Sequence, residues 1–451
     1  MGTFNMASQQ VFLVGVALTF VLGNVSAVEG LETRENPAPA EHGAPLDKTD
    51  TELQWKQPEG QKNHGRERDV LIRTGDGVKG GDEHMENTVA KFDDDCPKGC
   101  SCSFSTVTCF GTLDSIPPKF PPDTTRLVLY YNNFTSVPSN AFPNLDKLEY
   151  LMMPFGKVGF IENNAFSGLG SVILLNLSTN SIDSLISTAF TGLENLQSLD
   201  LVSNKIDSFA DGAFEPLKKL KFLLITPVSS QYPYNAFNSL VNLETLYVQD
   251  GRFAAVPGYA FSRMKKLSML IIADNPNLTT IHPDAFAPGT LNESLTSIDL
   301  NHCNLREIPS QIFRYVQSLR SFTVSNNPIG QVDDNAFANL PNLMYLNLQG
   351  LGLAVLSKGA FNGLDSIQSI YMDSNNLVTL TPDHFTSHVK TLKAMTLSDN
   401  PWHCDCDLWR FNRWLRTETN ITVYQSLICA SPEQLRGQKL DKITATQAGC
   451  P

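Results

Sequence analysis

The nine cysteines are the residues whose types and spacing most clearly imply chemistry, because eight of them fall into two tight groups. The first group is Cys96, Cys100, Cys102 and Cys109. The second group is Cys404, Cys406, Cys429 and Cys450. Thiols at such spacings form disulfides in an oxidising compartment, or they bind zinc through a C-x-C pair and two more distant cysteines.

An apolar leader favours disulfides over zinc. Residues 11–23, VFLVGVALTFVLG, are too few to span a bilayer but match the core of a signal peptide. Small residues at Val25, Ser26 and Ala27 allow cleavage after Ala27. The residues before this run lack Lys and Arg, so an N-terminal signal anchor is the alternative. Export would place the thiols where disulfides form.

Each group of four cysteines allows three pairings. A pair separated by one residue, such as Cys404–Cys406, is sterically poor, and we favour the crossed pairing in both groups. The predicted bonds are Cys96–Cys102, Cys100–Cys109, Cys404–Cys429 and Cys406–Cys450.

The remaining polar residues give no sign of catalysis. The eight histidines are scattered, and we find no Ser/His/Asp or Cys/His constellation, paired carboxylates or metal spacing. We therefore predict a protein that is not an enzyme and needs no cofactor and no metal. Five Asn-x-Ser/Thr sequons follow the leader and become candidate glycan sites if the chain is exported. They begin at Asn133, Asn176, Asn277, Asn292 and Asn420.

The elements that must position these residues come from an internal repeat. The segment LQSLDLVSNKIDSFADGAFEPL at residues 196–217 recurs about every 24 residues, with starts at 124, 148, 172, 196, 220, 243, 267, 295, 319, 343, 367 and 392. Its core, L-x-x-L-x-L-x-x-N-x-L, alternates apolar and polar residues as a strand with one buried face does. This period is typical of a leucine-rich-repeat solenoid, an α/β fold curved like a horseshoe with a parallel concave sheet.

The Asn of the template must bond to the backbone of a neighbouring coil, because an unsatisfied buried amide costs about 1–3 kcal/mol. Stacked in register, these Asn residues form a ladder, and we call their place in the template the ladder position. In one repeat it is occupied by Cys303, which we predict to be a buried free thiol. Four further repeats also lack Asn at the ladder position, and we expect their coils to be looser or bent. The residues there are Gly156, Val228, Gly251 and Leu351.

A solenoid leaves an apolar face open at each end, so we interpret the two cysteine groups as disulfide-knotted caps. The predicted organisation is a signal peptide (1–27), an acidic segment predicted to be disordered (28–95), an N-terminal cap (96–123), about 11–12 repeats (124–397) and a C-terminal cap (398–451).

The segment 28–95 carries seventeen acidic and nine basic residues and few large apolar ones, a composition that predicts disorder. A propeptide, a tether and an interaction tail remain open as its role. The rest of the chain is close to neutral, which argues against nucleic acid as a partner. No second apolar run is long enough to span a membrane, so we expect no membrane span in the mature chain.

The repeats and both caps, above all the motif NPWHCDC followed by W, L, C and C, resemble extracellular leucine-rich-repeat proteins with cysteine-rich flanks. This group includes Toll-like receptor ectodomains, Nogo receptors, Slit proteins and variable lymphocyte receptors. The resemblance covers residues 96–451 and implies recognition of a protein or glycan by a curved scaffold. The chain departs from the receptor members in showing no transmembrane helix, signalling domain or stalk, so direct signalling is not expected.

Outward positions of the predicted strands supply two candidate ligand-binding groups. The first is the row Leu224, Tyr247 and Ile271, three apolar residues at one template position in consecutive repeats. Phe222 and Met269 flank it, and Asp250 and Asp274 follow on the same strands. The second group, beside the N-terminal cap, is Tyr130, Tyr131, Tyr150, Met152 and Phe155. Packing of irregular coils is the alternative interpretation of both groups, and a glycan on Asn176 would lie between them.

These features together predict a secreted binding protein that recognises an extracellular protein or glycoprotein through its concave face. One alternative is an extracellular-matrix organising or adhesion protein with broad contacts. Another is the soluble form of an innate-immune-type receptor ectodomain.

Overall fold

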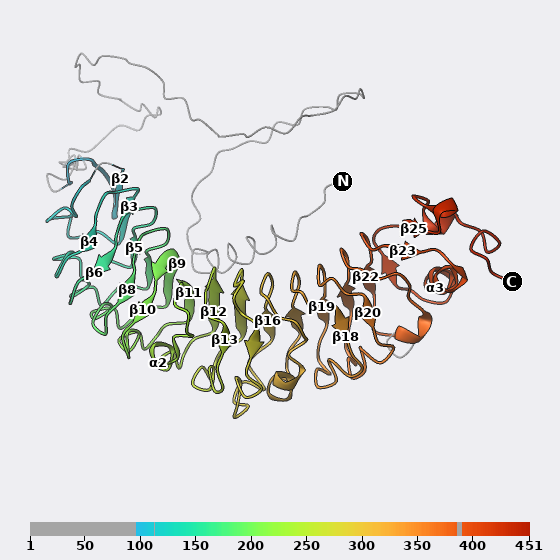
Figure 1. Ribbon diagram of the computed structural model, residues 1–451. Helices are drawn as coiled ribbons and strands as arrows, with labels where there is room; N and C mark the ends of the chain where they lie inside the picture. The colour runs from blue at the N-terminus through green and yellow to red at the C-terminus, as the bar shows by residue number, and fades with distance from the viewer. Residues whose placement is uncertain (1–95, 112, 386–389) are drawn as a thin grey trace, which may run out of the picture. The chain divides into compact units, whose positions relative to one another are not determined.

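The computed structural model describes residues 96–111, 113–385 and 390–451. The predicted signal peptide and the acidic segment 28–95 lie outside the described residues. The described residues form a curved solenoid in which each repeat contributes a short strand to the concave side (Figure 1). The predicted fold class is confirmed.

One sheet of fifteen strands runs the length of the solenoid. Its first two strands are antiparallel, and every later neighbour is parallel. The strands, in order across the sheet, are β1 (Cys100–Ser103), β2 (Thr106–Phe110), β3 (Arg126–Tyr130), β5 (Tyr150–Met152), β7 (Leu174–Asn176), β9 (Ser198–Ile206), β11 (Phe222–Pro227), β12 (Thr245–Gln249), β14 (Met269–Ala273), β16 (Ser297–Asp299), β17 (Ser321–Thr323), β19 (Tyr345–Asn347), β21 (Ser369–Tyr371), β22 (Ala394–Thr396) and β24 (Thr422–Val423).

The predicted repeat register is confirmed strand by strand. From β3 to β22, each of the twelve repeat strands begins two residues after the repeat start predicted from the sequence. Leu199 and Leu201 of β9 are fully buried, while Asp200 between them faces outward and is half-buried. The alternation of the template therefore sets which side chains form the core and which form the concave surface.

The other regular elements are short and connect or close the turns. Five parallel pairs form small sheets: β4 (Ser136–Val137) with β6 (Phe160–Ile161), β8 (Ser184–Leu185) with β10 (Ser208–Phe209), β13 (Ala255–Val256) with β15 (Thr280–Ile281), β18 (Gln331–Val332) with β20 (Val355–Leu356), and β23 (Trp402–His403) with β25 (Cys429–Ser431). The helices are α2 (Tyr234–Phe237), α3 (Cys406–Thr417), η1 (Ser310–Tyr315), η2 (Pro382–His384), η3 (Glu433–Leu435) and η4 (Leu440–Lys442).

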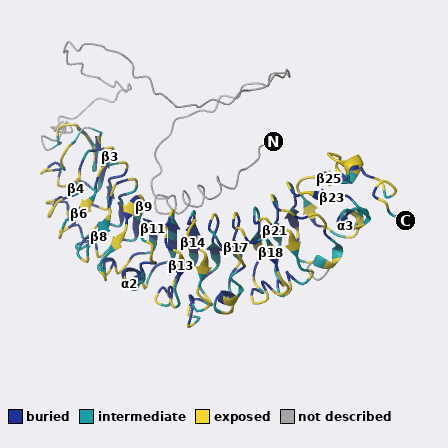
Figure 2. Cartoon of the chain, in the orientation of Figure 1, coloured by how far each residue is buried: buried dark blue, intermediate teal, exposed yellow. Residues whose placement is uncertain are grey.

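Two stacked rows hold successive turns together. Buried residues continue along the whole arc (Figure 2). Phe142, Phe166, Phe190 and Phe214 stack with ring centroids 5.8–6.5 Å apart. The second row is the amide ladder. Asn204 Oδ1 accepts the backbone N–H of Ile182 at 3.0 Å, and its Nδ2 donates to the carbonyl of Leu177 in the preceding turn at 3.0 Å.

The ladder is interrupted around repeats five to seven. Where Val228 replaces the amide, strands β9 and β11 lengthen and their pairing shifts register between Ile225 and Pro227. Beyond Gly251, the side chain of Asn275 is fully buried, yet neither its Nδ2 nor its Oδ1 has a hydrogen-bond partner in the described structure. The amide ladder thus contributes least to stability in the turns that carry the first candidate group.

Disulfides close both ends. The pairs are Cys96–Cys102, Cys100–Cys109, Cys404–Cys429 and Cys406–Cys450, with Cα–Cα distances of 5.9, 4.1, 5.5 and 4.8 Å. They are the pairs predicted from the sequence.

The C-terminal cap also depends on helix α3 and a buried tryptophan. Asp405 caps α3 by accepting the N–H of Leu408 at 3.0 Å, and Trp402 Nε1 donates to the carbonyl of Leu397 at 3.1 Å. Cys303 is free and buried, and burial raises the pKa of its thiol to about 12. None of the helices among the described residues has the length and apolar character needed to cross a membrane.

Candidate binding surface

The first candidate group is brought together by strand pairing. In the parallel register of β11, β12 and β14, Leu224 lies opposite Tyr247 and Tyr247 lies opposite Ile271. All three side chains are half-buried, because each stands between neighbouring strands and its own neighbours in sequence point into the core. We call these three residues the central row.

Each flanking residue lies two positions before a member of the central row on the same strand. Phe222 and Met269 both pair with Thr245, so they lie on either side of a threonine and do not pair with each other. Both are half-buried. The central row is therefore a continuous apolar strip, whereas the flanking apolar residues are divided by a polar one.

Aspartates surround Tyr247. Burial raises the pKa of Tyr247 to about 12, and the negative charges of Asp274, Asp299, Asp250 and Asp200 add to the rise. The Tyr247 hydroxyl donates to Gln249 Oε1 at 2.8 Å. Asp250 has its pKa raised by partial burial and by the neighbouring Asp274.

Asp200 stands beside the central row, opposite Leu224 in the sheet. Burial raises its pKa to about 6, although its carboxylate accepts the backbone N–H of Val202 at 3.0 Å. Asn176 Nδ2 also donates to Asp200 Oδ2 at 3.2 Å, and Asn176 Oδ1 accepts the N–H of Ser178 at 2.8 Å. Both ends of the Asn176 amide are thus engaged within the concave face.

The second candidate group divides in two. Tyr130, Tyr150 and Met152 lie on strands β3 and β5, where the Tyr130 hydroxyl contacts Met152 Sδ at 3.8 Å and the Arg126 guanidinium lies 4.8 Å from the centre of the Tyr150 ring. Tyr131 and Phe155 lie beyond the strand ends and are exposed.

Phe110 lies beside Tyr131 and Phe155 in a row of exposed rings, of which the sequence predicted only Tyr131 and Phe155. Ring centroids are 5.3 Å apart from Phe110 to Tyr131 and 5.0 Å apart from Tyr131 to Phe155. We call these three residues the aromatic shelf. Phe110 ends β2 in the cap, outside the repeat template, and only its pairing with Tyr130 could have placed it.

Tyr131 and Phe155 have left-handed backbone conformations, with φ of 58° and 57°. Aspartate occupies the same template position at Asp250, Asp274 and Asp399, also with positive φ. Short polar residues tolerate this conformation, whereas a bulky ring is strained there. The shelf therefore carries a conformational cost that most repeats avoid.

A third group of concave tyrosines was not predicted. Tyr345 and Tyr371 occupy outward positions of the adjacent strands β19 and β21, and Tyr424 follows β24 in the cap. Burial raises the pKa of Tyr371, and Tyr424 and Tyr345 add to the rise. The template positions of Tyr345 and Tyr371 could have revealed two members of this group.

The sequons fall on different parts of the solenoid. Asn277 and Asn420 are exposed, whereas Asn133, Asn176 and Asn292 are half-buried. Asn133 Nδ2 donates to Asp114 Oδ1 at 3.2 Å, and Asn292 Oδ1 accepts the N–H of Gln317 at 2.7 Å.

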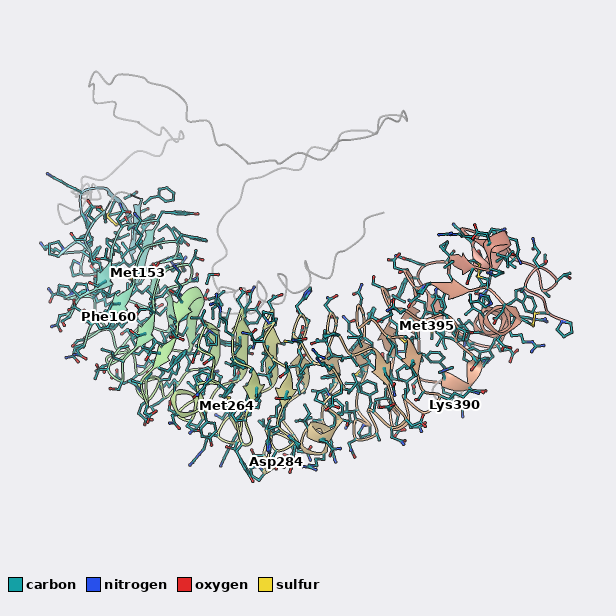
Figure 3. The ribbon with its side chains drawn as sticks, in the orientation of Figure 1. Met153, Phe160, Met264, Asp284, Lys390 and Met395 are labelled. Carbon is teal, nitrogen blue, oxygen red and sulfur yellow. A yellow bond between two sulfur atoms is a disulfide. The ribbon has the colours of Figure 1, made fainter. Side chains whose placement is uncertain are left out.

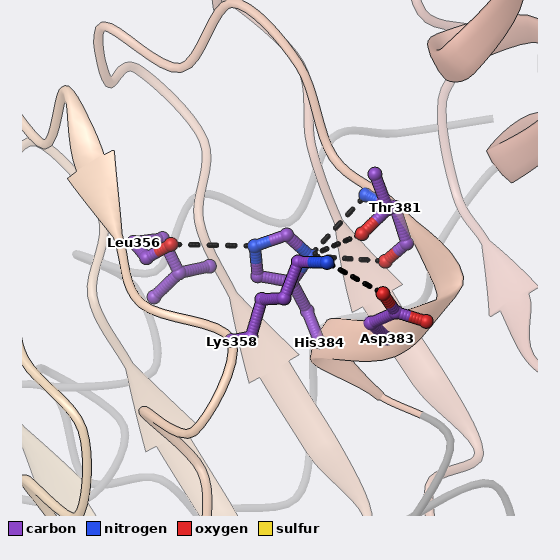
Figure 4. A network of polar contacts seen from close by, with 5 residues as sticks. All are labelled: Leu356, Lys358, Thr381, Asp383 and His384. Carbon is purple, nitrogen blue, oxygen red and sulfur yellow. Dashed lines mark hydrogen bonds and ion pairs between the residues drawn. The ribbon is translucent and has the colours of Figure 1, made fainter.

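Polar networks elsewhere tie turns to one another. His384 bonds to the carbonyl of Leu356 through Nε2 at 3.2 Å and to Thr381 through Nδ1, while Lys358 pairs with Asp383 at 2.6 Å (Figure 4). Asp284, at the convex rim in Figure 3, accepts the hydroxyl of Tyr315 at 2.8 Å. Within the described ranges, no three His, Cys, Asp or Glu side chains gather as metal ligands would.

The parallel register, the amide ladder and the two disulfide caps define a cysteine-capped repeat solenoid. The Leucine rich repeat family model matches more than half of the chain, so the chain belongs to the leucine-rich-repeat family. The matched residues are 122–182, 174–226, 241–288, 293–353 and 343–401.

Several known proteins are similar in sequence to parts of the chain. Leucine-rich repeat-containing protein 3 of Danio rerio is 30% identical over 33% of this chain and 54% of its own length. Trophoblast glycoprotein of Mus musculus is 28% identical over 30% of this chain and 32% of its own. Chondroadherin of Homo sapiens is 32% identical over 24% of this chain and 28% of its own. The chain thus spans about half or less of the length of these relatives.

Solved structures share the fold. A chain of the octameric complex of latrophilin 3, Unc5D and the leucine-rich repeat of FLRT2 has a TM-score of 0.58 and 23% identity over 79% of this chain and 100% of its own. A leucine-rich-repeat protein of Leptospira interrogans has a TM-score of 0.55 and 24% identity over 68% of this chain and 75% of its own.

Proposed function

We propose that this protein is an exported, non-enzymatic binding protein that recognises a protein or glycoprotein through the concave face between repeats five and seven. The observation that carries the proposal is the central row. Three half-buried apolar side chains lie in register on the solvent side of the sheet, and apolar residues grouped on a surface, in contrast to single scattered ones, favour a binding role.

The proposed compartment rests on the cysteines. Eight cysteines in four disulfides are typical of exported proteins. The relatives support the same location, since they include trophoblast glycoprotein and chondroadherin. The leader at residues 11–23 would direct export, with cleavage after Ala27.

A matrix or adhesion role is the second candidate. The observation that favours it is the spread of aromatic residues along the arc, from the aromatic shelf at one cap to Tyr345, Tyr371 and Tyr424 at the other end. Contacts distributed in this way would support broad adhesion without one focused site.

Expression of the full chain in secretory cells tests both candidates. Thiol labelling of the exported protein under denaturing, non-reducing conditions should modify Cys303 alone. Cross-linking at the cell surface should then recover a protein partner with the wild type and not with a Leu224→Ser/Ile271→Ser variant. If the variant captures the same partner equally well, the central row is not the site. Adhesion to deposited matrix that is insensitive to this variant would favour the second candidate.

A further inference from the structure

The concave face around the central row has a one-sided charge. Among the outward-facing residues of 198–203, 222–226, 245–250, 269–274 and 297–302 there are four aspartates and no lysine or arginine, and the exposed Lys205 and Arg252 lie further along their turns. The aspartates are Asp200, Asp250, Asp274 and Asp299.

Strand pairing fixes these carboxylates around the row. Asp200 lies opposite Leu224 at one end, and Asp299 lies opposite Ile271 at the other. Asp250 and Asp274 follow β12 and β14 with φ of 53° and 51°. All four act on Tyr247 electrostatically, so the middle residue of the strip lies in a field of one sign.

Ion pairs among the described residues leave two of these carboxylates, Asp250 and Asp274, without a basic partner. The nearby Lys221, beside the start of β11, is paired with Glu244 at 3.5 Å. A cationic group from another molecule would therefore be attracted by the carboxylates that act on Tyr247.

From this charge complementarity we propose that the apolar central row docks a basic segment of a protein partner, with an Arg or Lys side chain on Tyr247 and the acids around it. The aliphatic stem of such a side chain suits Leu224 and Ile271, and its charged end suits an aromatic face among carboxylates. Arginine fits best, because its planar group can stack on a ring and bond to a carboxylate together. This inference rests on the proposed function and names the chemistry of the partner.

A display library of random linear peptides, selected on the full exported chain, tests the inference. The wild type should enrich peptides that combine Arg or Lys with apolar residues. An Asp250→Asn/Asp274→Asn variant should bind the selected peptides about tenfold more weakly, the loss expected for two partly screened charge contacts. Raising the ionic strength should weaken peptide binding by the wild type and reduce the difference in affinity between the wild type and the double variant.

Asp399→Asn is the matched control, because Asp399 occupies the same template position with φ of 53° in the last repeat. It should leave peptide affinity unchanged. Enriched peptides without an excess of basic residues, or equal losses in the control and the double variant, would overturn the inference. If those neutral peptides still require Tyr247, the proposed site stands without the basic partner. If Tyr247→Ala binds all selected peptides as the wild type does, the proposed site itself is wrong.

Discussion

The central row and the aromatic shelf expose the same kind of side chain from different positions of one repeat. Leu224, Tyr247 and Ile271 stand on strands and are half-buried between their neighbours. Tyr131 and Phe155 stand on the left-handed residue after the strand and are 51% and 46% exposed. Packing against neighbouring strands therefore supports a side chain on the strand, whereas a large side chain on the left-handed residue after the strand strains the backbone.

This difference determines what a mutation at each place can report. In the central row, half of each side chain packs on the scaffold, so truncation changes both stability and binding. On the aromatic shelf, ring removal relieves a strained residue while it deletes a stacking contact, so the two stability effects oppose each other.

The largest effect should come from breaking the ladder on one side of the central row. Asn204→Leu should lower the free energy of unfolding by about 3 kcal/mol or more, since one buried N–H and two carbonyls lose a partner at about 1–3 kcal/mol each. Asn275→Leu is the matched change on the other side, where the amide makes no side-chain hydrogen bond in the described structure. It should be neutral or stabilising. Denaturant unfolding measures both, and equal losses would contradict the ladder described above.

A smaller effect, dependent on pH, should come from Asp200. Its pKa of about 6 lies above the ordinary 3.8, so the folded state binds the proton more tightly than the unfolded state does. The stability of the wild type should therefore fall as pH rises from about 4 to 7, by about 1–3 kcal/mol from this group. Asp200→Asn removes that dependence, so the stability of the variant relative to the wild type should increase as pH rises. Unfolding curves at about pH 4 and pH 7 check this expectation. An increase in the stability of the wild type relative to the variant as pH rises would show that the charged form is not destabilising.

The smallest effect is expected on the aromatic shelf. Phe155→Asn places a residue that tolerates the left-handed conformation at a φ of 57°, as Asn326 already does at 55° in the same template position. Relief of strain and loss of stacking on Tyr131 should nearly cancel, leaving a change in stability below about 1 kcal/mol. Thermal unfolding gives the answer. A loss of several kcal/mol would mean that the shelf is part of the core.

The repeat made much of this structure predictable. Since the template fixes a period and a buried face, the sequence located all twelve repeat strands and placed Leu224, Tyr247 and Ile271 in one row. The free thiol at Cys303 followed from the same register.

Features that depend on exceptions to the template could not be predicted. Phe110 belongs to the cap, where no period applies, so the aromatic shelf was incomplete. The orphaned amide of Asn275 depends on the atomic fit between two turns, which residue type alone does not reveal. Ligand contacts at Phe222, Met269, Tyr130 and Tyr150 remain proposals, since their outward position shows access and not binding.

The central claim is that the middle of the concave face, and not the solenoid in general, binds the partner. Tyr247→Ala and Tyr371→Ala remove the same side chain from the same template position, in repeats six and eleven. We expect similar falls in melting temperature, whereas affinity for a partner captured by the wild type should fall about thirtyfold with Tyr247→Ala alone, as for the loss of an aromatic anchor worth about 2 kcal/mol. Equal affinities for the two variants, with only the melting temperatures lowered, would contradict the account.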